Sequence, residues 1–163
     1  METKKIYAII AAIALALPAF AQGGKDLYNK YSDLPGVSAV YISPAMFRLI
    51  GKIPDVELAD EDVNFTPIIK SMNGFYLLST EDAATGQKLY GEVSRGLSKS
   101  KYELLMEAKE DGEVMRLYSV GDSKTVTSLL LLAKDGSETT FLSIDGQMDR
   151  AKLEEVIASA AAD

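Results

Sequence analysis

Residues 102–144 read YELLMEAKEDGEVMRLYSVGDSKTVTSLLLLAKDGSETTFLSI, and apolar and polar side chains alternate along them with a period of two. This is the period of a β-strand whose two faces differ, so the stretch predicts consecutive strands. Asp111-Gly112 and Asp135-Gly136 separate two pairs of them, and Asp-Gly supplies the left-handed conformations that two-residue hairpin turns need. The stretch therefore predicts an antiparallel meander of four strands, at residues 102–110, 113–120, 126–134 and 138–144.

Strands and helices alternate before this meander. Residues 37–43 are mostly β-branched or aromatic, and Ser43-Pro44 then supplies a helix cap followed by proline at the first helical position. Thr66-Pro67 repeats that signal. We expect strands at 37–43 and 75–79, and helices at 44–50, 66–72 and 148–158. Another helix is capped by Thr80-Glu81-Asp82 and runs to about Leu97. This order predicts the α+β class: a mixed sheet with a C-terminal antiparallel four-strand meander, and helices packed mainly on one face.

The first 21 residues predict a cleavable export signal. Two lysines precede an apolar run over residues 6–17, and the following Pro-Ala-Phe-Ala ends in a small-x-small pattern at Ala21. The apolar run is shorter than the roughly 20 residues that cross a bilayer, which makes a retained anchor the less favoured alternative. We therefore expect a signal peptide at 1–21, cleavage after Ala21, and a single α+β domain at 22–163.

The composition limits the cellular compartment and the kinds of partner that we expect. The 163 residues carry a net charge of −7, with 24 Asp and Glu against 17 Lys and Arg. Because the basic residues are scattered among more numerous acids, nucleic acid is not an expected partner. The absence of cysteine excludes lipid attachment through that residue. We expect a soluble periplasmic or secreted protein that is not a lipoprotein and has no stable membrane anchor.

The missing residue types also limit the chemistry. With no histidine and no cysteine, the chain lacks the commonest general base, the commonest zinc ligand and the thiol nucleophile. Residues 98–101 contain a Ser-x-x-Lys spacing, but Lys124-Thr125 is followed by Val126 where the companion motif of penicillin-recognising enzymes has Gly. We interpret 98–101 as a solvated link. The sequence predicts no catalytic residue, no metal site and no cofactor.

An acidic connector offers one weak metal pattern. Asp60, Asp62 and Asn64 stand at alternate positions, as they do at the start of a calcium loop. Phe65 then stands where the sharp turn needs Gly, and Ser71 stands where a bidentate Glu should close the coordination. We expect weak divalent-ion affinity at best. The simpler interpretation is negative charge near a helix start.

The Asp111-Gly112 turn also predicts which hairpin residues face each other. The expected pairs are Lys109 with Val114, Ala108 with Met115, Glu107 with Arg116, Met106 with Leu117 and Leu105 with Tyr118. We expect one set of side chains to point towards the helices, namely Met106, Ala108, Met115 and Leu117.

The other side of that hairpin is our candidate binding site. An apolar pair, Leu105 and Tyr118, lies there beside an opposite-charge pair, Glu107 and Arg116. An apolar anchor with a polar rim is typical of protein interfaces. We predict that Leu105, Glu107, Arg116 and Tyr118 bind a partner; an ordinary solvated sheet face is the alternative.

Several blocks together resemble a family of exported bacterial proteins called domain of unknown function 4252. The blocks are residues 31–33, 36–43 with 45–47, 74–81, 102–106 running into 111–113, and 129–132 with the ending at 145–146. The resemblance implies an exported α+β domain, typical of Bacteroidetes-like bacteria, whose members have a plain signal peptide or a lipid-attachment cysteine. It implies no activity and supplies no site residues.

Two function classes stay open. The favoured hypothesis is an exported, non-enzymatic module that binds an unknown protein partner or a second copy of itself, or serves as an accessory. The alternative is a small hydrolase-like enzyme that uses carboxylates. An enzyme needs a pocket with convergent acids of shifted pKa, whereas a binding module needs only an open surface.

Overall fold

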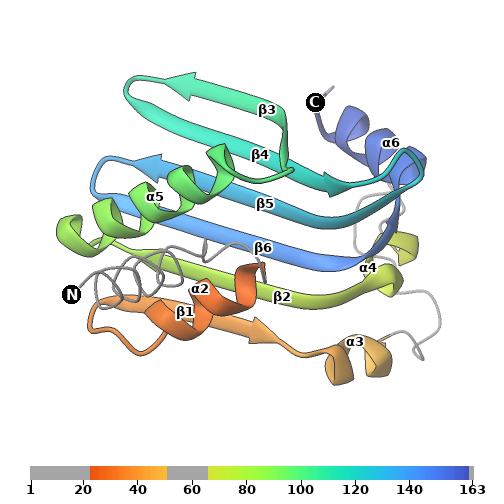
Figure 1. Cartoon of the computed structure of the whole chain (residues 1–163), viewed down its shortest axis with the longest axis horizontal. Coiled ribbons are helices and arrows are strands. Elements are labelled where there is room, and N and C mark those ends of the chain that lie inside the picture. The colour runs from red at the N-terminus through yellow and green to blue at the C-terminus, as the bar shows by residue number, and fades with distance from the viewer. Residues whose placement is uncertain (1–22, 51–65, 162–163) are drawn as a thin grey trace, which may run out of the picture.

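The computed structural model of the chain describes residues 23–50 and 66–161, and its centre is a six-stranded sheet (Figure 1). The order across the sheet is β1-β2-β6-β5-β4-β3, so β1 and β3 form its two edges. The strands are β1 (Val37–Ile42), β2 (Met72–Thr80), β3 (Glu103–Glu110), β4 (Glu113–Gly121), β5 (Thr125–Asp135) and β6 (Glu138–Asp149). The expected cleavage after Ala21 and the acidic connector at 60–64 lie outside the described residues.

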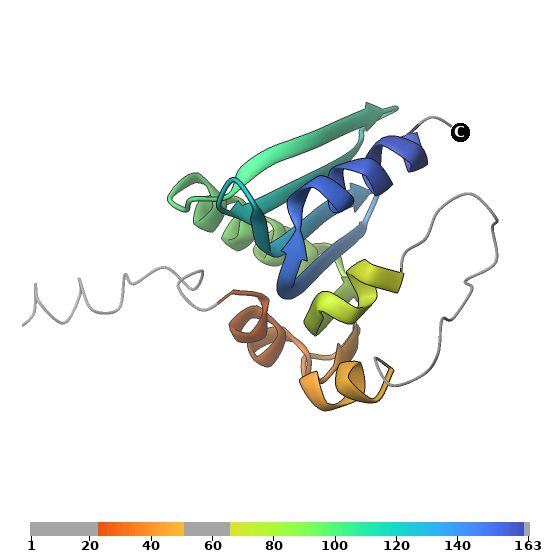
Figure 2. The ribbon, with the colours of Figure 1, turned by 90° about the vertical axis from the view of Figure 1, so that its right-hand side faces the viewer.

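The described helices lie on both sides of this sheet (Figure 2). They are α2 (Gly24–Tyr31), α3 (Pro44–Ile50), α4 (Thr66–Ser71), α5 (Ala83–Ser98) and α6 (Arg150–Ala161). Helices α2 and α5 pack on one face, which we call the covered face. Helices α4 and α6 pack on the other, which we call the open face, and α3 lies against β2 and α4.

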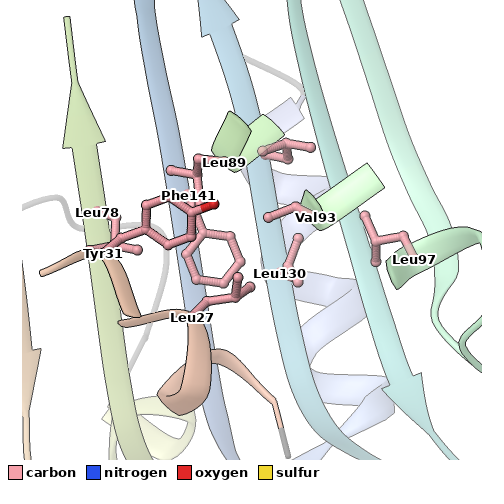
Figure 3. Close-up of a cluster of buried hydrophobic side chains, with 9 residues drawn as sticks. Leu27, Tyr31, Leu78, Leu89, Val93, Leu97, Leu130 and Phe141 are labelled. Atoms are coloured by element: carbon pink, nitrogen blue, oxygen red, sulfur yellow. The ribbon is translucent and has the colours of Figure 1, made fainter. Parts of the chain in front are cut away.

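Burial on the covered face supplies the main core (Figure 3). Alternate residues of β2, β5 and β6 point to this face, and Leu78, Leu130 and Phe141 are fully buried there. Burying one large aliphatic or aromatic side chain contributes about 1.5–3 kcal/mol, so this layer dominates the stability of the fold. The cluster consists of Leu27, Tyr31, Leu78, Leu89, Val93, Leu97, Leu130, Leu132 and Phe141.

A second, smaller core lies on the open face, where β5 begins and β6 ends. Ile68 of α4 and Leu153 of α6 cover the strand residues Val126, Leu129 and Met148. The two helices therefore shield this end of the open face.

The predicted meander and the α+β class are confirmed. Strands β3 to β6 follow one another across the sheet, and Asp111 and Gly112 adopt φ values of 47° and 90° in the first turn. In the second turn Asp135 pairs with Glu138, so the loop residues lie one position later than expected, and Gly136 takes the positive φ of 56°.

Two parts of the predicted architecture are wrong. The sheet is not mixed: β1 pairs with β2 antiparallel, and so do all other neighbouring strands described. The helices do not gather on one face. Strand β2 pairs antiparallel to β1 because α3, which follows β1, and α4, which precedes β2, lie at the same end of the sheet (Figure 1).

An ionic contact joins the two helices of the covered face. Lys30 donates from Nζ to Oε1 of Glu92 at 2.7 Å, and the Tyr31 hydroxyl donates to Oε2 at 2.6 Å. Burial raises the pKa of Glu92, but the hydrogen bonds from Lys30 and Tyr31 outweigh it and hold that pKa below its usual range. Burial, and then the bond to Glu92, raise the pKa of Tyr31. The ionised carboxylate therefore stabilises the packing of α2 on α5.

We expect this contact to depend on pH. Because the pKa of Glu92 is lowered by folding, its contribution is present above the pKa of the unfolded chain and is lost as pH falls through the folded value. At pH about 7, Glu92→Gln should lower the free energy of unfolding by about 1–2 kcal/mol. Urea unfolding between pH about 7 and 3 checks this. A difference from wild type that persists at the lowest pH would contradict an ionic role.

Two glycines of α5 should respond oppositely to alanine. A Cβ at Gly86 would lie 2.7 Å from Oγ1 and 3.2 Å from Cβ of buried Thr139, whereas at Gly91 the nearest atom is Nη1 of Arg95 at 3.4 Å. Alanine is favoured over glycine in helices by about 1 kcal/mol. We expect Gly91→Ala to raise the free energy of unfolding by up to about 1 kcal/mol, and Gly86→Ala to lower it by about 1–3 kcal/mol. Equal gains in urea unfolding would contradict close packing of α5 on β6.

Candidate binding surface

A continuous row of aliphatic side chains crosses the open face. Each member is the direct cross-strand partner of the next, from one edge of the sheet to the other. The row is Val40, Leu77, Leu142, Leu131, Leu117 and Met106, and we call it the aliphatic row. With strands about 4.8 Å apart, it extends for about 24 Å.

The aliphatic row is only partly shielded from solvent. Among the described residues, neither core cluster includes any of its members. Val40 is 45% exposed, and the other members lie between buried and exposed. Contiguous apolar surface of this kind is typical of interaction sites in folded proteins, unlike single exposed hydrophobic residues. The row is therefore a candidate binding surface.

A row of carboxylates lies on the same face, at the hairpin end. Glu110 is the direct partner of Glu113, and Asp135 is the direct partner of Glu138. We call these four residues the acidic row. Each stands four residues along its strand from a member of the aliphatic row. Since strands rise about 3.4 Å per residue, the two rows run about 14 Å apart.

The acidic row is electrostatically unfavourable for the isolated protein. Like charges directly opposite each other destabilise a sheet. A hydrogen bond with Asp135 and its negative charge raise the pKa of Glu113. Among the described residues, the ion pairs join Lys30 to Glu92, and Lys109 and Arg116 to Glu107, and none includes a member of the acidic row. Glu138 accepts a hydrogen bond at 2.8 Å from the hydroxyl of Ser79, which carries no charge.

The predicted hairpin register is mostly confirmed. The pairs Lys109–Val114, Ala108–Met115, Glu107–Arg116 and Met106–Leu117 all form. The fifth pair is wrong, because a β-bulge lies between Leu104 and Met106 and makes Leu104 the partner of Tyr118. Leu105 is the extra residue at this bulge and is 40% exposed.

The predicted orientation of the hairpin is also wrong. Arg116 donates from Nη1 to the phenol oxygen of Tyr90 on α5 at 2.7 Å, and Tyr118 packs against the core of the covered face. Glu107 accepts from Nε of Arg116 at 2.6 Å and so joins them near α5. The set expected to point towards the helices, Met106, Ala108, Met115 and Leu117, lies on the open face instead. We still predict that a partner binds at Leu105, Glu107, Arg116 and Tyr118, but this site would lie at the β3 side of the sheet, beside α5.

The sequence did contain a signal for the aliphatic row. Leu129–Leu132 and Phe75–Leu78 are uninterrupted apolar runs, so both faces of β5 and β2 are apolar. Such runs are typical of strands that need cover on both sides. The helices of the covered face can shield only one side of the sheet, so apolar residues on the other side stay partly exposed.

The carboxylates with raised pKa lie away from the hollow found near the start of α6. This hollow has a volume of about 250 Å³ and contains Lys101, Arg150, Glu103 and Asp122. The backbone N–H groups of Lys124 and Thr125 hold the pKa of Asp122 below its usual range. Burial raises the pKa of Asp145, but neither Asp145 nor Glu113 lines the hollow. Its lining residues are Lys101, Glu103, Ser119, Val120, Gly121, Asp122, Ser123 and Arg150.

The described residues, 23–50 and 66–161, contain neither a membrane-spanning helix nor a metal-binding cluster. Within these ranges no helix is both long enough and apolar enough to span a membrane. In the same ranges, no three acidic side chains converge closely enough to bind a metal ion.

The orientation of the hairpin generates a stability prediction. Tyr118→Ser removes a ring that packs on the covered-face core and should lower the free energy of unfolding by about 3 kcal/mol. Met106→Ser changes a partly exposed side chain on the edge strand and should cost about 1 kcal/mol. Urea unfolding of both variants measures the difference. A larger loss for Met106→Ser would show that the hairpin faces the other way.

Comparison with known proteins adds one weak structural likeness. The solution structure of cyanobacterial PsbP from Synechocystis sp. PCC 6803 aligns with 18% sequence identity and a TM-score of 0.29, covering 76% of each chain. A TM-score this low does not establish a shared fold. No curated protein matches the chain significantly.

One family model matches most of the described chain. It spans residues 31–156, from the end of α2 into α6, and thus includes every strand of the sheet. The expected family resemblance is confirmed: the chain belongs to the family described as Domain of unknown function (DUF4252).

Proposed function

We propose that this protein is an exported, non-enzymatic accessory module that binds another protein through the open face of its sheet. The observation that carries the proposal is the aliphatic row, six direct cross-strand partners that reach from β1 to β3. Export is supported by the signal-like pattern of residues 1–21.

The row suits a binding role on energetic grounds. Apolar area removed from water contributes about 25 cal/mol per Å², so covering a partly exposed aliphatic row stabilises a complex substantially. The strands that carry the six side chains are already joined by backbone hydrogen bonds, so the backbone needs little ordering when a partner binds. A preformed apolar surface framed by polar groups is the usual arrangement at protein interfaces.

The hydrolase alternative requires a different arrangement. Carboxylate catalysis needs acids of raised pKa inside a concave site. Here the carboxylates whose pKa is raised are Glu113, on an exposed strand end, and Asp145, on the covered face beside Gly23. The observations on the described residues therefore favour the binding module.

Site-specific photo-crosslinking in an exporting host tests the proposal. A photoreactive phenylalanine analogue replaces Leu131 or Leu142, both central in the aliphatic row. We expect a discrete covalent adduct with a partner protein at either position, because these side chains contact whatever covers the open face. Immunoblotting and mass spectrometry of the adduct provide the measurement.

Two further positions serve as comparisons. Lys88 is exposed on α5, away from the open face, and should give no adduct. Leu105 tests the edge predicted from the sequence. Adducts from Lys88 or Leu105 without any from Leu131 and Leu142 would assign binding to another surface and refute the proposal.

A further inference from the structure

We propose that the occupant of the open face is a cationic, amphipathic α-helix of the partner protein. The helix lies across the strands, with its apolar stripe on the aliphatic row and its Lys or Arg side chains over the acidic row. This inference rests on the proposed function and adds the chemistry of the partner.

The spacing of the two rows fits one helix. A helix has a diameter of about 10 Å with its side chains, and the rows are about 14 Å apart. An apolar stripe can therefore lie on the aliphatic row while extended Lys or Arg side chains on one flank reach the carboxylates. The 24 Å length of the aliphatic row corresponds to about 16 helical residues at 1.5 Å each.

The pitch of an α-helix also matches the spacing between the strands. Carboxylates of the acidic row come from neighbouring strands, which are about 4.8 Å apart, and one helical turn rises about 5.4 Å. Cations placed one turn apart along the helix can thus meet successive carboxylates from β6, β5, β4 and β3. A helix that ran along the strands could approach only one or two of them.

The residues between the two rows leave room for such a helix. They are cross-strand partners of one another on the same face, and most are small. The set is Ser38, Ser79, Thr140, Ala133, Met115 and Ala108. Only Met115 is large, and methionine adapts readily to the shape of a partner.

Charge complementarity decides in favour of a cationic partner. Each side chain of the acidic row faces a like charge across the ladder, while the lysine nearest in the first hairpin, Lys109, is paired with Glu107. Cations of a partner would relieve this repulsion and speed its encounter with the protein. A second copy of the chain would instead add another acidic row and another net charge of −7.

Peptide binding tests the inference. The probe is an amidated helical peptide of about 18 residues, with leucines on one stripe, lysines on both flanks and one tryptophan. The protein has no tryptophan, so the fluorescence of the peptide reports binding. We expect it to bind at least about tenfold more tightly than the same peptide with glutamate for lysine, and to weaken about tenfold between about 50 and 300 mM salt.

Matched charge variants locate the contact. Glu113→Gln with Asp135→Asn should weaken binding of the lysine peptide about tenfold and reduce its salt dependence. Glu154→Gln with Glu155→Gln makes the same change of charge on exposed positions of α6 and should leave binding within about twofold. Leu131→Ser should weaken binding of the lysine peptide without altering its salt dependence.

Each contrary result has a definite meaning. Equal binding of the lysine and glutamate peptides, or binding of neither, overturns the cationic helix. Loss of binding in the Glu154 and Glu155 control also overturns it, since the contact would then lie on α6. Dimerisation that Leu131→Ser abolishes identifies a second copy as the occupant. The proposed function fails separately, when Leu131 and Leu142 give no photo-adduct in the exporting host.

Discussion

Burial of the covered face beneath α2 and α5 is the interaction on which the remaining structure depends. Helix α5 has three glycines within 16 residues, so it has little intrinsic helical stability and forms because Leu89, Val93 and Leu97 pack on the sheet. Helix α2 has only 8 residues and likewise depends on the burial of Leu27 and Tyr31. The sheet and its two helices therefore stabilise one another and are not independent elements.

This dependence explains how an apolar surface can stay uncovered. The covered face supplies the stability of the fold, and α4 and α6 add a smaller core at one end of the open face. The aliphatic row contributes to neither core, so its sequence is free to serve contact with another molecule. The acidic row does not stabilise the fold either, because its carboxylates repel one another and no cation among the described residues forms an ion pair with them.

Much of the backbone could be predicted from the sequence, but the role of each face could not. Asp111-Gly112 specifies a two-residue turn, and this fixes the pairing from Glu110 and Glu113 as far as Met106 and Leu117. The strand contains neither Gly nor Pro near Leu105, so the sequence pattern does not predict a bulge there. The predicted orientation of the hairpin is wrong because both alternating sets of its side chains contain apolar residues, so the pattern does not distinguish the two faces. In addition, the long aliphatic part of the Arg116 side chain can pack against a helix as well as at a protein interface.

The bulge at Leu105 has a consequence for colloidal behaviour. Among the described strands, β1 and β3 each have a neighbouring strand on one side only, and such edges can recruit identical chains into fibrils. At β3 the extra residue interrupts the regular spacing that an added strand would have to match. At β1 the strand is only 6 residues long, with Pro35 shortly before it and Pro44 shortly after it. The protein can thus display an apolar sheet surface while its borders resist templated aggregation.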